Sequence, residues 1–202
     1  MAFLKERFRP EGIEVGCDEA GRGCLAGPVV AAAAVVPKGW RNPILNDSKK
    51  LTESNRNELR KIIEDEFEHW AVGFVYPEEI DEINILNASF LAMHKAIESL
   101  KCKADLILVD GNRFNSFQKV PHECVIKGDG KYSAIAAASI LAKTHRDEFM
   151  QNMHNEYPYY DWHRNKGYPT AKHREAIRAN GPCEHHRKSF QLLPVQLEIF
   201  TK

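Results

Sequence analysis

The chain has 202 residues, 43% hydrophobic and 28% charged, with a formal net charge of +0, which is typical of a soluble globular protein with one well-buried domain. Charges interrupt the first residues where a signal peptide would be apolar, and no apolar run reaches the length of a membrane span, so we expect a cytoplasmic protein without membrane contact. The five cysteines are scattered and form no C-x-x-C pair, which argues against a disulfide framework or a zinc knuckle.

The first half of the chain has a β-rich start. Strands are expected at "GIEVGCDE" and at "PVVAAAAVVP", although the alanines of the second run leave its assignment open. A helix is expected from about Thr52, its N-cap, to Trp70, because apolar residues recur there at helical spacing. A short strand at "AVGFVY" and an amphipathic helix over 84–100 follow.

The second half alternates strands with helices and ends in helices. Buried strands are expected over 105–111, ending at Asp110, and over 123–130, ending near Asp129. Helices are then expected at about 132–154, near 171–179 and near 194–200. This order predicts a single α/β domain over residues 1–202, with residues from about 155 onward as a helical C-terminal extension.

Acidic residues recur where the predicted strands give way to glycine. These acids are Asp18, Glu19, Asp110 and Asp129. Strands of one sheet lie side by side, so acids at their ends can converge, and a divalent cation such as Mg²⁺ or Mn²⁺ would relieve their mutual repulsion. Each acid taken alone is also compatible with an ordinary solvated turn. Neighbouring strand residues point to opposite faces, so Asp18 and Glu19 can share a site only if the strand twists or bulges.

Other motifs fit known binding sites less well. In "GRGCLAG" the third glycine is displaced from the dinucleotide-binding spacing, and a strand rather than a helix is expected after it. No G-K-[ST] sequence is present, which excludes a P-loop. "CEHHRKS" resembles half of a zinc site but lacks a second half, and we expect a basic surface turn there.

Basic and aromatic residues suggest contacts with nucleic acid. Lys49 precedes the first predicted helix, where a phosphate could bind, although a solvent-exposed turn explains it equally well. Arg164 and Lys166 accompany Tyr168 in "HRNKGYPTAKHR", a loop restricted by glycine and proline, and such a loop suits a sugar–phosphate backbone.

The motifs taken together resemble those of a known family. "GCDEAGRGCLAGPVVAAA", "LNDSKKL", "LVDGNR", "IKGDG", "IAAASILAKTHRDEFM", "RNKGYPTAKH" and "EHHRKSF" are similar, in this order, to motifs of bacterial ribonuclease HII. The similarity extends from about residue 12 to 190. A single motif of this kind arises by chance, but the ordered set is specific.

The resemblance implies a ribonuclease H-like fold, with a central mixed sheet flanked by helices, and a metal-dependent endonuclease. Its implied substrates are RNA–DNA hybrids, cut in the RNA strand, and duplex DNA containing single ribonucleotides. By motif, Asp18, Glu19, Asp110 and Asp129 are the implied catalytic acids. The residues implied to recognise the ribonucleotide are Gly21, Arg22, Gly23 and Tyr168.

Phosphodiester hydrolysis by two metal ions fits these residues. We expect Asp18, Glu19 and Asp110 to bind metal, and Asp129 either to complete the metal site or to orient the attacking water. We expect a monomer. A nucleic-acid binding module without catalysis and a phosphohydrolase acting on small nucleotides are the alternatives, and cleavage of a ribonucleotide-containing duplex would distinguish them.

Overall fold

The computed structural model describes residues 3–46 and 48–194, without the side chain of Lys49. Five strands form a single sheet. They are β1 (Glu14–Ala20), β2 (Val29–Ala34), β3 (Trp70–Val75), β4 (Leu106–Asp110) and β5 (His122–Val125). The α-helices are α1 (Glu53–Glu66), α2 (Pro77–Glu98), α3 (Ser133–Glu156), α4 (Trp162–Asn165) and α5 (Ala171–Asn180), and the short 3₁₀ helices are η1 (Ser48–Lys50), η2 (Gly128–Gly130) and η3 (Pro158–Tyr160).

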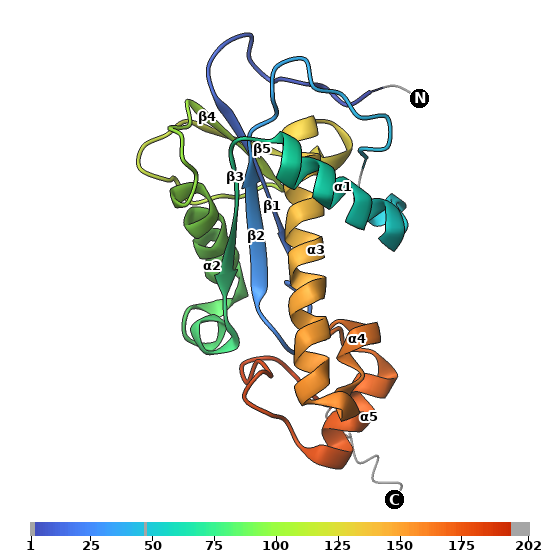
Figure 1. Cartoon of the computed structure of the whole chain (residues 1–202). Coiled ribbons are helices and arrows are strands. Elements are labelled where there is room, and N and C mark those ends of the chain that lie inside the picture. The colour runs from blue at the N-terminus through green and yellow to red at the C-terminus, as the bar shows by residue number, and fades with distance from the viewer. Residues whose placement is uncertain (1–2, 47, 195–202) are drawn as a thin grey trace, which may run out of the picture.

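The sheet is mixed, with the strand order β3-β2-β1-β4-β5. β1 pairs antiparallel with β2 and parallel with β4, so the carboxyl ends of β1 and β4 reach the same edge of the sheet. Figure 1 shows α2 on one side of the sheet and α3 on the other, with α1 lying over α3. The predicted α/β architecture of a mixed sheet flanked by helices is confirmed.

Alternation along the strands decides which helix each side chain meets. Val15 and Cys17 of β1 belong to the core that includes α2, whereas Gly16 lies against α3. In β2 the same rule sends Ala31 to the α2 side and Ala32 to the α3 side. Every residue of β2 is buried because helices cover both faces, which explains a strand made almost entirely of alanine and valine.

α3 lies unusually close to β1. A Cβ atom added to Gly16 would lie 2.1 Å from the backbone carbon of Ala134, so only glycine fits at this position. The residues of α3 that face the sheet are small as well, and residues 133–142 are all buried. This close packing brings the side chains of α3 within reach of the carboxyl end of β1.

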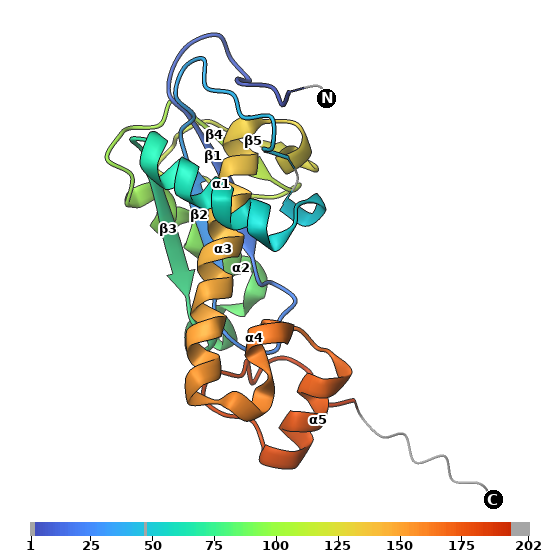
Figure 2. The ribbon, with the colours of Figure 1, turned by 45° about the vertical axis from the view of Figure 1, so that its right-hand side comes forward.

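The segment after α3 folds back beside the C-terminal end of that helix, where α4 and α5 lie together in both views (Figure 2). Met150 of α3 and Trp162 of α4 share a buried cluster with Leu25 and Ala26, which lie between β1 and β2. The C-terminal helices therefore pack on the loop that follows the acidic end of β1.

Some predicted boundaries were wrong. α2 begins at Pro77 instead of residue 84, because proline is well suited to the first turn of a helix; the non-helical backbone of Asn84 (φ +65°) then offsets the two parts of α2. The predicted strand over 123–130 ends at Val125, and Asp129 lies in η2. The predicted helix near 194–200 lies outside the described residues. None of the helices in the described part of the chain is long and apolar enough to cross a bilayer.

Candidate active site

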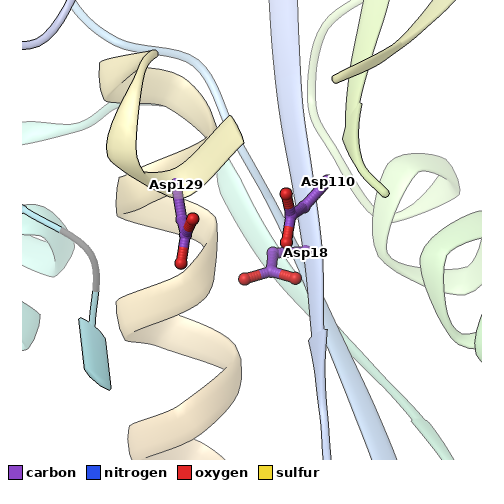
Figure 3. Close-up of side chains that lie close together, drawn as sticks. All are labelled: Asp18, Asp110 and Asp129. Atoms are coloured by element: carbon purple, nitrogen blue, oxygen red, sulfur yellow. The ribbon is translucent and has the colours of Figure 1, made fainter. Parts of the chain in front are cut away.

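Three aspartates from three separate elements lie together at the edge of the sheet. Asp18 belongs to β1, Asp110 ends β4 and Asp129 lies in η2. One carboxylate oxygen of each lies within 4.8 Å of the corresponding oxygens of the others, and Figure 3 shows the three side chains directed toward a common space.

Strand pairing explains how two of these acids meet. The parallel ladder between β1 and β4 ends at the pair Cys17 and Val109, so the next residues, Asp18 and Asp110, leave the ladder side by side. A hydrogen bond then brings in the third acid: the backbone N–H of Gly128 donates to Asp110 Oδ1 at 2.7 Å. The turn that carries Asp129 is thus fixed to the carboxylate of Asp110.

Glu19 lies on the opposite face of β1 from Asp18. The pairing of β1 with β2 continues without a bulge as far as Ala20, so the alternation of side chains is kept. Glu19 consequently lies outside the cluster of three aspartates, and its Oε1 accepts a hydrogen bond from Arg22 Nη1 at 3.0 Å. Asp110, at the strand end, is close enough to raise the pKa of both Asp18 and Glu19.

Burial makes ionisation of Asp18 and of Glu19 unfavourable. Burial raises the pKa of Asp18 well above its usual range, and the neighbouring charges of Glu19 and Asp110 raise it further, while a hydrogen bond from Ser139 opposes them. Burial also raises the pKa of Glu19, against the opposing effect of Arg22. Carboxylates that repel one another and offer only oxygen ligands are the donor set that a hard divalent cation prefers, so these residues fit such a metal.

A pocket of about 290 Å³ joins the acids to most of the predicted recognition residues. Its lining includes Asp18, Glu19 and Asp110, together with Gly21, Arg22, Gly23 and Tyr168. Residues predicted from separate parts of the sequence therefore lie around one space.

Gly21 has a backbone conformation and a position that exclude a side chain. Its φ is +91°, and a Cβ atom there would lie 2.0 Å from Nε of Arg146. A Cβ atom on Gly23, in contrast, would meet nothing within 4 Å. The backbone at Gly23 is therefore open to a ligand, whereas Gly21 is required for packing.

Tyr168 borders the pocket from the loop between α4 and α5. Its ring is partly exposed and lies 6.0 Å from the guanidinium of Arg146. Gly167 before it has φ +81°, and a Cβ atom there would lie 2.5 Å from the carbonyl oxygen of Ala26. The direction of the Tyr168 side chain is set by this tightly packed turn.

Lys49 lies in η1, and its side chain is outside the described part of the structure. The neighbouring Ser48 also borders the pocket, and its hydroxyl lies 2.9 Å from that of Ser139 on α3. Arg56 holds this turn by donating to the carbonyl oxygen of Ser48 at 3.2 Å.

Four polar or charged residues line the pocket but were not among the predicted site residues: Ser48, Arg56, Ser139 and Lys143. Ser139 was detectable in principle, since it is one of the few polar residues in the small, apolar first half of α3. Lys143 pairs with Asp147 one turn later. The contact between Ser48 and Ser139 joins residues 91 positions apart, and no local pattern indicates it.

The expectation of a basic surface turn at "CEHHRKS" was wrong. His186 and Arg187 are fully buried. Arg187 donates to the carbonyl oxygens of Gly27 at 3.0 Å and of Arg22 at 2.9 Å, so this segment supports the loop that carries Gly21 to Gly23. The burial of this charged side chain is partly compensated by the two backbone carbonyl oxygens that accept its hydrogen bonds.

Comparison with known proteins gives consistent matches. A family model described as ribonuclease HII matches residues 15–193. A ribonuclease HII of Phocaeicola vulgatus is 62% identical over 189 residues, which are 93% of this chain and 94% of that protein. A ribonuclease HII of Bacteroides thetaiotaomicron is 62% identical over 181 residues, 90% of each chain. Among solved structures, the crystal structure of ribonuclease H2 from Pyrococcus horikoshii superposes with a TM-score of 0.73 at 27% identity, covering 89% of this chain and 94% of the other.

Proposed function

The chain belongs to the ribonuclease HII family and has the ribonuclease H-like fold, and from this premise we propose that its acid cluster and the adjoining pocket cut duplex DNA at single embedded ribonucleotides. As a member of this family it is a ribonuclease H, an endonuclease that hydrolyses the RNA strand of RNA–DNA hybrids with the help of divalent metal ions. Cleavage at a single ribonucleotide is the narrower claim. It rests on the residues around the pocket.

The observation that carries this proposal is the continuity between the acids and the recognition residues. Asp18, Glu19 and Asp110 line the same pocket as the Gly21–Gly23 turn and Tyr168. An enzyme that must find one ribose in a DNA strand needs contacts to that sugar close to the scissile phosphate. The pocket supplies both within about 290 Å³.

We assign Asp18 and Asp110 to metal binding, and also Glu19, which lies outside the aspartate cluster but lines the same pocket. Asp129 is assigned either to the same role or to orienting the attacking water. Two Mg²⁺ or Mn²⁺ ions, when bound, would activate that water and stabilise the leaving oxygen. The protein's own contribution is to hold the carboxylates in place before metal arrives. β1, β4 and η2 do this through the ladder and the hydrogen bond from Gly128 to Asp110.

The recognition residues have separate tasks in this proposal. The backbone around Gly23 approaches the ribose, because no side chain stands in the way. Tyr168 offers an apolar ring face and a hydroxyl to the sugar or base. Arg22, half exposed beside Glu19, and Lys49 in η1 are assigned to phosphate contacts.

A cleavage assay tests the proposal. A labelled DNA duplex with one central ribonucleotide, incubated with the protein and Mg²⁺ or Mn²⁺, should give a single cut beside the ribonucleotide. The matched all-DNA duplex and a reaction containing a chelator serve as controls, and neither should be cut. A protein that cuts an RNA–DNA hybrid but leaves the single-ribonucleotide duplex intact would refute the narrower claim while keeping the family activity.

The non-catalytic alternative is not favoured, since the family is one of endonucleases. We further propose that residues 1–202 act as one catalytic domain, as a monomer and in the cytoplasm. The five free cysteines support a reducing compartment. Light scattering coupled to gel filtration, with and without substrate, tests the monomer.

A further inference from the structure

A buried chain of hydrogen bonds leads from the C-terminal segment to the backbone of Tyr168. His173, in the first turn of α5, has its Nδ1 2.9 Å from the carbonyl oxygen of Tyr168. Its Nε2 lies 3.0 Å from the indole nitrogen of Trp162 and 3.2 Å from Nε2 of His186. The backbone N–H of Cys183 lies 3.1 Å from Nδ1 of His186. The side chains of His173, Trp162 and His186 are all fully buried.

The donors in this series of hydrogen bonds, Trp162 and the backbone of Cys183, fix the tautomers of His173 and His186. The indole nitrogen of Trp162 can only donate, so Nε2 of His173 must accept and the proton of a neutral His173 resides on Nδ1. The backbone N–H of Cys183 can likewise only donate, so Nδ1 of His186 accepts and its Nε2 carries the proton. The Nε2–H of His186 and the indole N–H of Trp162 then share the single lone pair on Nε2 of His173, and the Nδ1–H of His173 donates to the carbonyl oxygen of Tyr168.

Neutral rings are the forms that fit these contacts. A second proton on Nε2 of His173 would face the donors of Trp162 and His186 and leave no acceptor for either. Burial lowers the pKa of both histidines, that of His186 to about 4, in agreement with the neutral rings.

We propose that His173 is a positioning residue for Tyr168: its Nδ1–H, directed by Trp162 and His186, holds the carbonyl of Tyr168 and thereby aims the ring into the pocket beside the acids. The backbone N–H of Thr170 donates to the same carbonyl at 2.8 Å, so His173 adds a side-chain donor to an oxygen that also accepts from the backbone of its own turn. This inference rests on the proposed function of Tyr168, and its test separates the two.

A pair of substitutions at His173 distinguishes positioning from packing. In His173→Asn the side-chain amide can take the place of Nδ1 and still donate to Tyr168, whereas in His173→Gln it takes the place of Nε2 and keeps only the contact with Trp162. Both variants remove an imidazole from the same buried site. We expect kcat/KM on the single-ribonucleotide duplex to be at least tenfold lower for His173→Gln than for His173→Asn.

The same two His173 substitutions are also made in a protein that carries Tyr168→Ala and so lacks the ring that His173 is inferred to position. In that background the difference between His173→Gln and His173→Asn should disappear, because both act through Tyr168. The same two substitutions at His69, which immediately precedes β3, serve as the matched control and should give equal kcat/KM. Equal kcat/KM for the two His173 variants in the wild-type background would overturn the inference.

The wild-type protein provides a test that needs no variant and no substrate. Histidine side-chain ¹⁵N–¹H spectra should identify His173 as protonated on Nδ1 and His186 as protonated on Nε2. A His173 protonated on Nε2 would overturn the inference, whatever the folding or activity of the variants. Unchanged cleavage by Tyr168→Ala, with Nδ1-protonated His173, would instead refute the proposed role of Tyr168 in recognition.

Discussion

Asp18 and Glu19 are neighbours in sequence but face opposite sides of β1, and Asp110 at the adjacent strand end influences both. Burial and the nearby carboxylates of Glu19 and Asp110 act together to raise the pKa of Asp18 well above its usual range. We therefore expect Asp18→Asn to abolish cleavage. Its free energy of unfolding without metal should be equal to that of the wild type or higher by up to about 2 kcal/mol, since a repelling charge is removed. Urea unfolding and the duplex assay measure both, and wild-type cleavage rates would contradict the metal-binding assignment.

Metal binding should raise the free energy of unfolding of the protein. A ligand that binds only the folded state adds about 2.7 kcal/mol at one hundred times its Kd. Adding Mg²⁺ or Mn²⁺ to the wild type should raise Tm accordingly, and a chelator should reverse the rise. Asp110→Asn should show a much smaller rise, because Asp110 belongs to the aspartate cluster and its charge acts on both Asp18 and Glu19. Equal rises in the two proteins would place the stabilising ion elsewhere.

Tyr168 offers two separable groups to a substrate. The residue is 42% exposed, whereas burial and the neighbouring Cys24 raise the pKa of its hydroxyl, so we expect the ring face to be the group that meets sugar or base. We expect Tyr168→Ala to lower kcat/KM sharply on the single-ribonucleotide duplex, and Tyr168→Phe to retain most of it. If Phe behaves like Ala, the hydroxyl reads the ribose, since a lost hydrogen bond costs about 1–3 kcal/mol. Wild-type activity in both variants would exclude Tyr168 from recognition.

Among the elements, α3 connects the acid site to the C-terminal helices, and Arg146 is the residue that makes this connection. It is buried and donates to the carbonyl oxygens of Pro28 at 3.0 Å, Ala26 at 3.1 Å and Lys166 at 2.8 Å. The first two lie in the loop after β1 and the third directly precedes the turn of Tyr168. Two loops far apart in sequence are therefore held by one side chain.

Arg146→Ala should destabilise the fold by about 3–5 kcal/mol, because it removes three hydrogen bonds to carbonyl oxygens, two of them buried. It should also lower cleavage, as the loop of Gly21 loses its support. Arg178→Ala, on the exposed side of α5, is the matched control and should change stability by less than about 0.5 kcal/mol. Urea denaturation compares them. A loss in Arg146→Ala no larger than that of the control would refute this role.

The extent to which sequence predicts structure differs between elements. The strands that carry Asp18 and Asp110 were predictable, because period-two patterns and long apolar runs are local properties. The position of Asp129 in η2 was not, since the turn is fixed by a hydrogen bond from Gly128 to Asp110, 18 residues earlier, which no local pattern contains. The burial of Arg187 depends on carbonyl oxygens about 160 residues earlier, and no local pattern contains that information.

For the whole molecule, the buried histidines predict how stability depends on pH. Burial, and secondarily the neighbouring His173 and His185, lower the pKa of His186 from 6.5 to about 4, against a small opposing effect of the backbone at Cys183. Between pH 6.5 and about 4, His186 is protonated in the unfolded chain but stays neutral in the folded chain. Stability should therefore be complete above pH 6.5 and fall toward pH 4, by at most about 1.4 kcal/mol per pH unit for this group.

The His186→Gln variant isolates this effect. Asp18, whose pKa is raised, contributes in the opposite direction in both proteins, so the difference between the two stability curves is the quantity to measure. The curves should run parallel above pH 6.5 and converge toward pH 4, as the wild type loses stability faster. Parallel curves over the whole range would show that protonation of His186 does not cause the loss of stability at low pH.

The hydrogen bonds from Arg146 and Arg187 to the loop after β1 have an evolutionary consequence. Both arginines hold carbonyl oxygens, at Arg22, Ala26, Gly27 and Pro28, and every amino acid carries this group. The anchoring of the loop is thus independent of the side chains displayed on it. An exposed side chain such as that of Arg22 can therefore be exchanged while the path of the backbone is kept. A library randomised at this position should keep the fold and vary chiefly in which nucleic acids it cuts, so the same scaffold can give rise to new specificities.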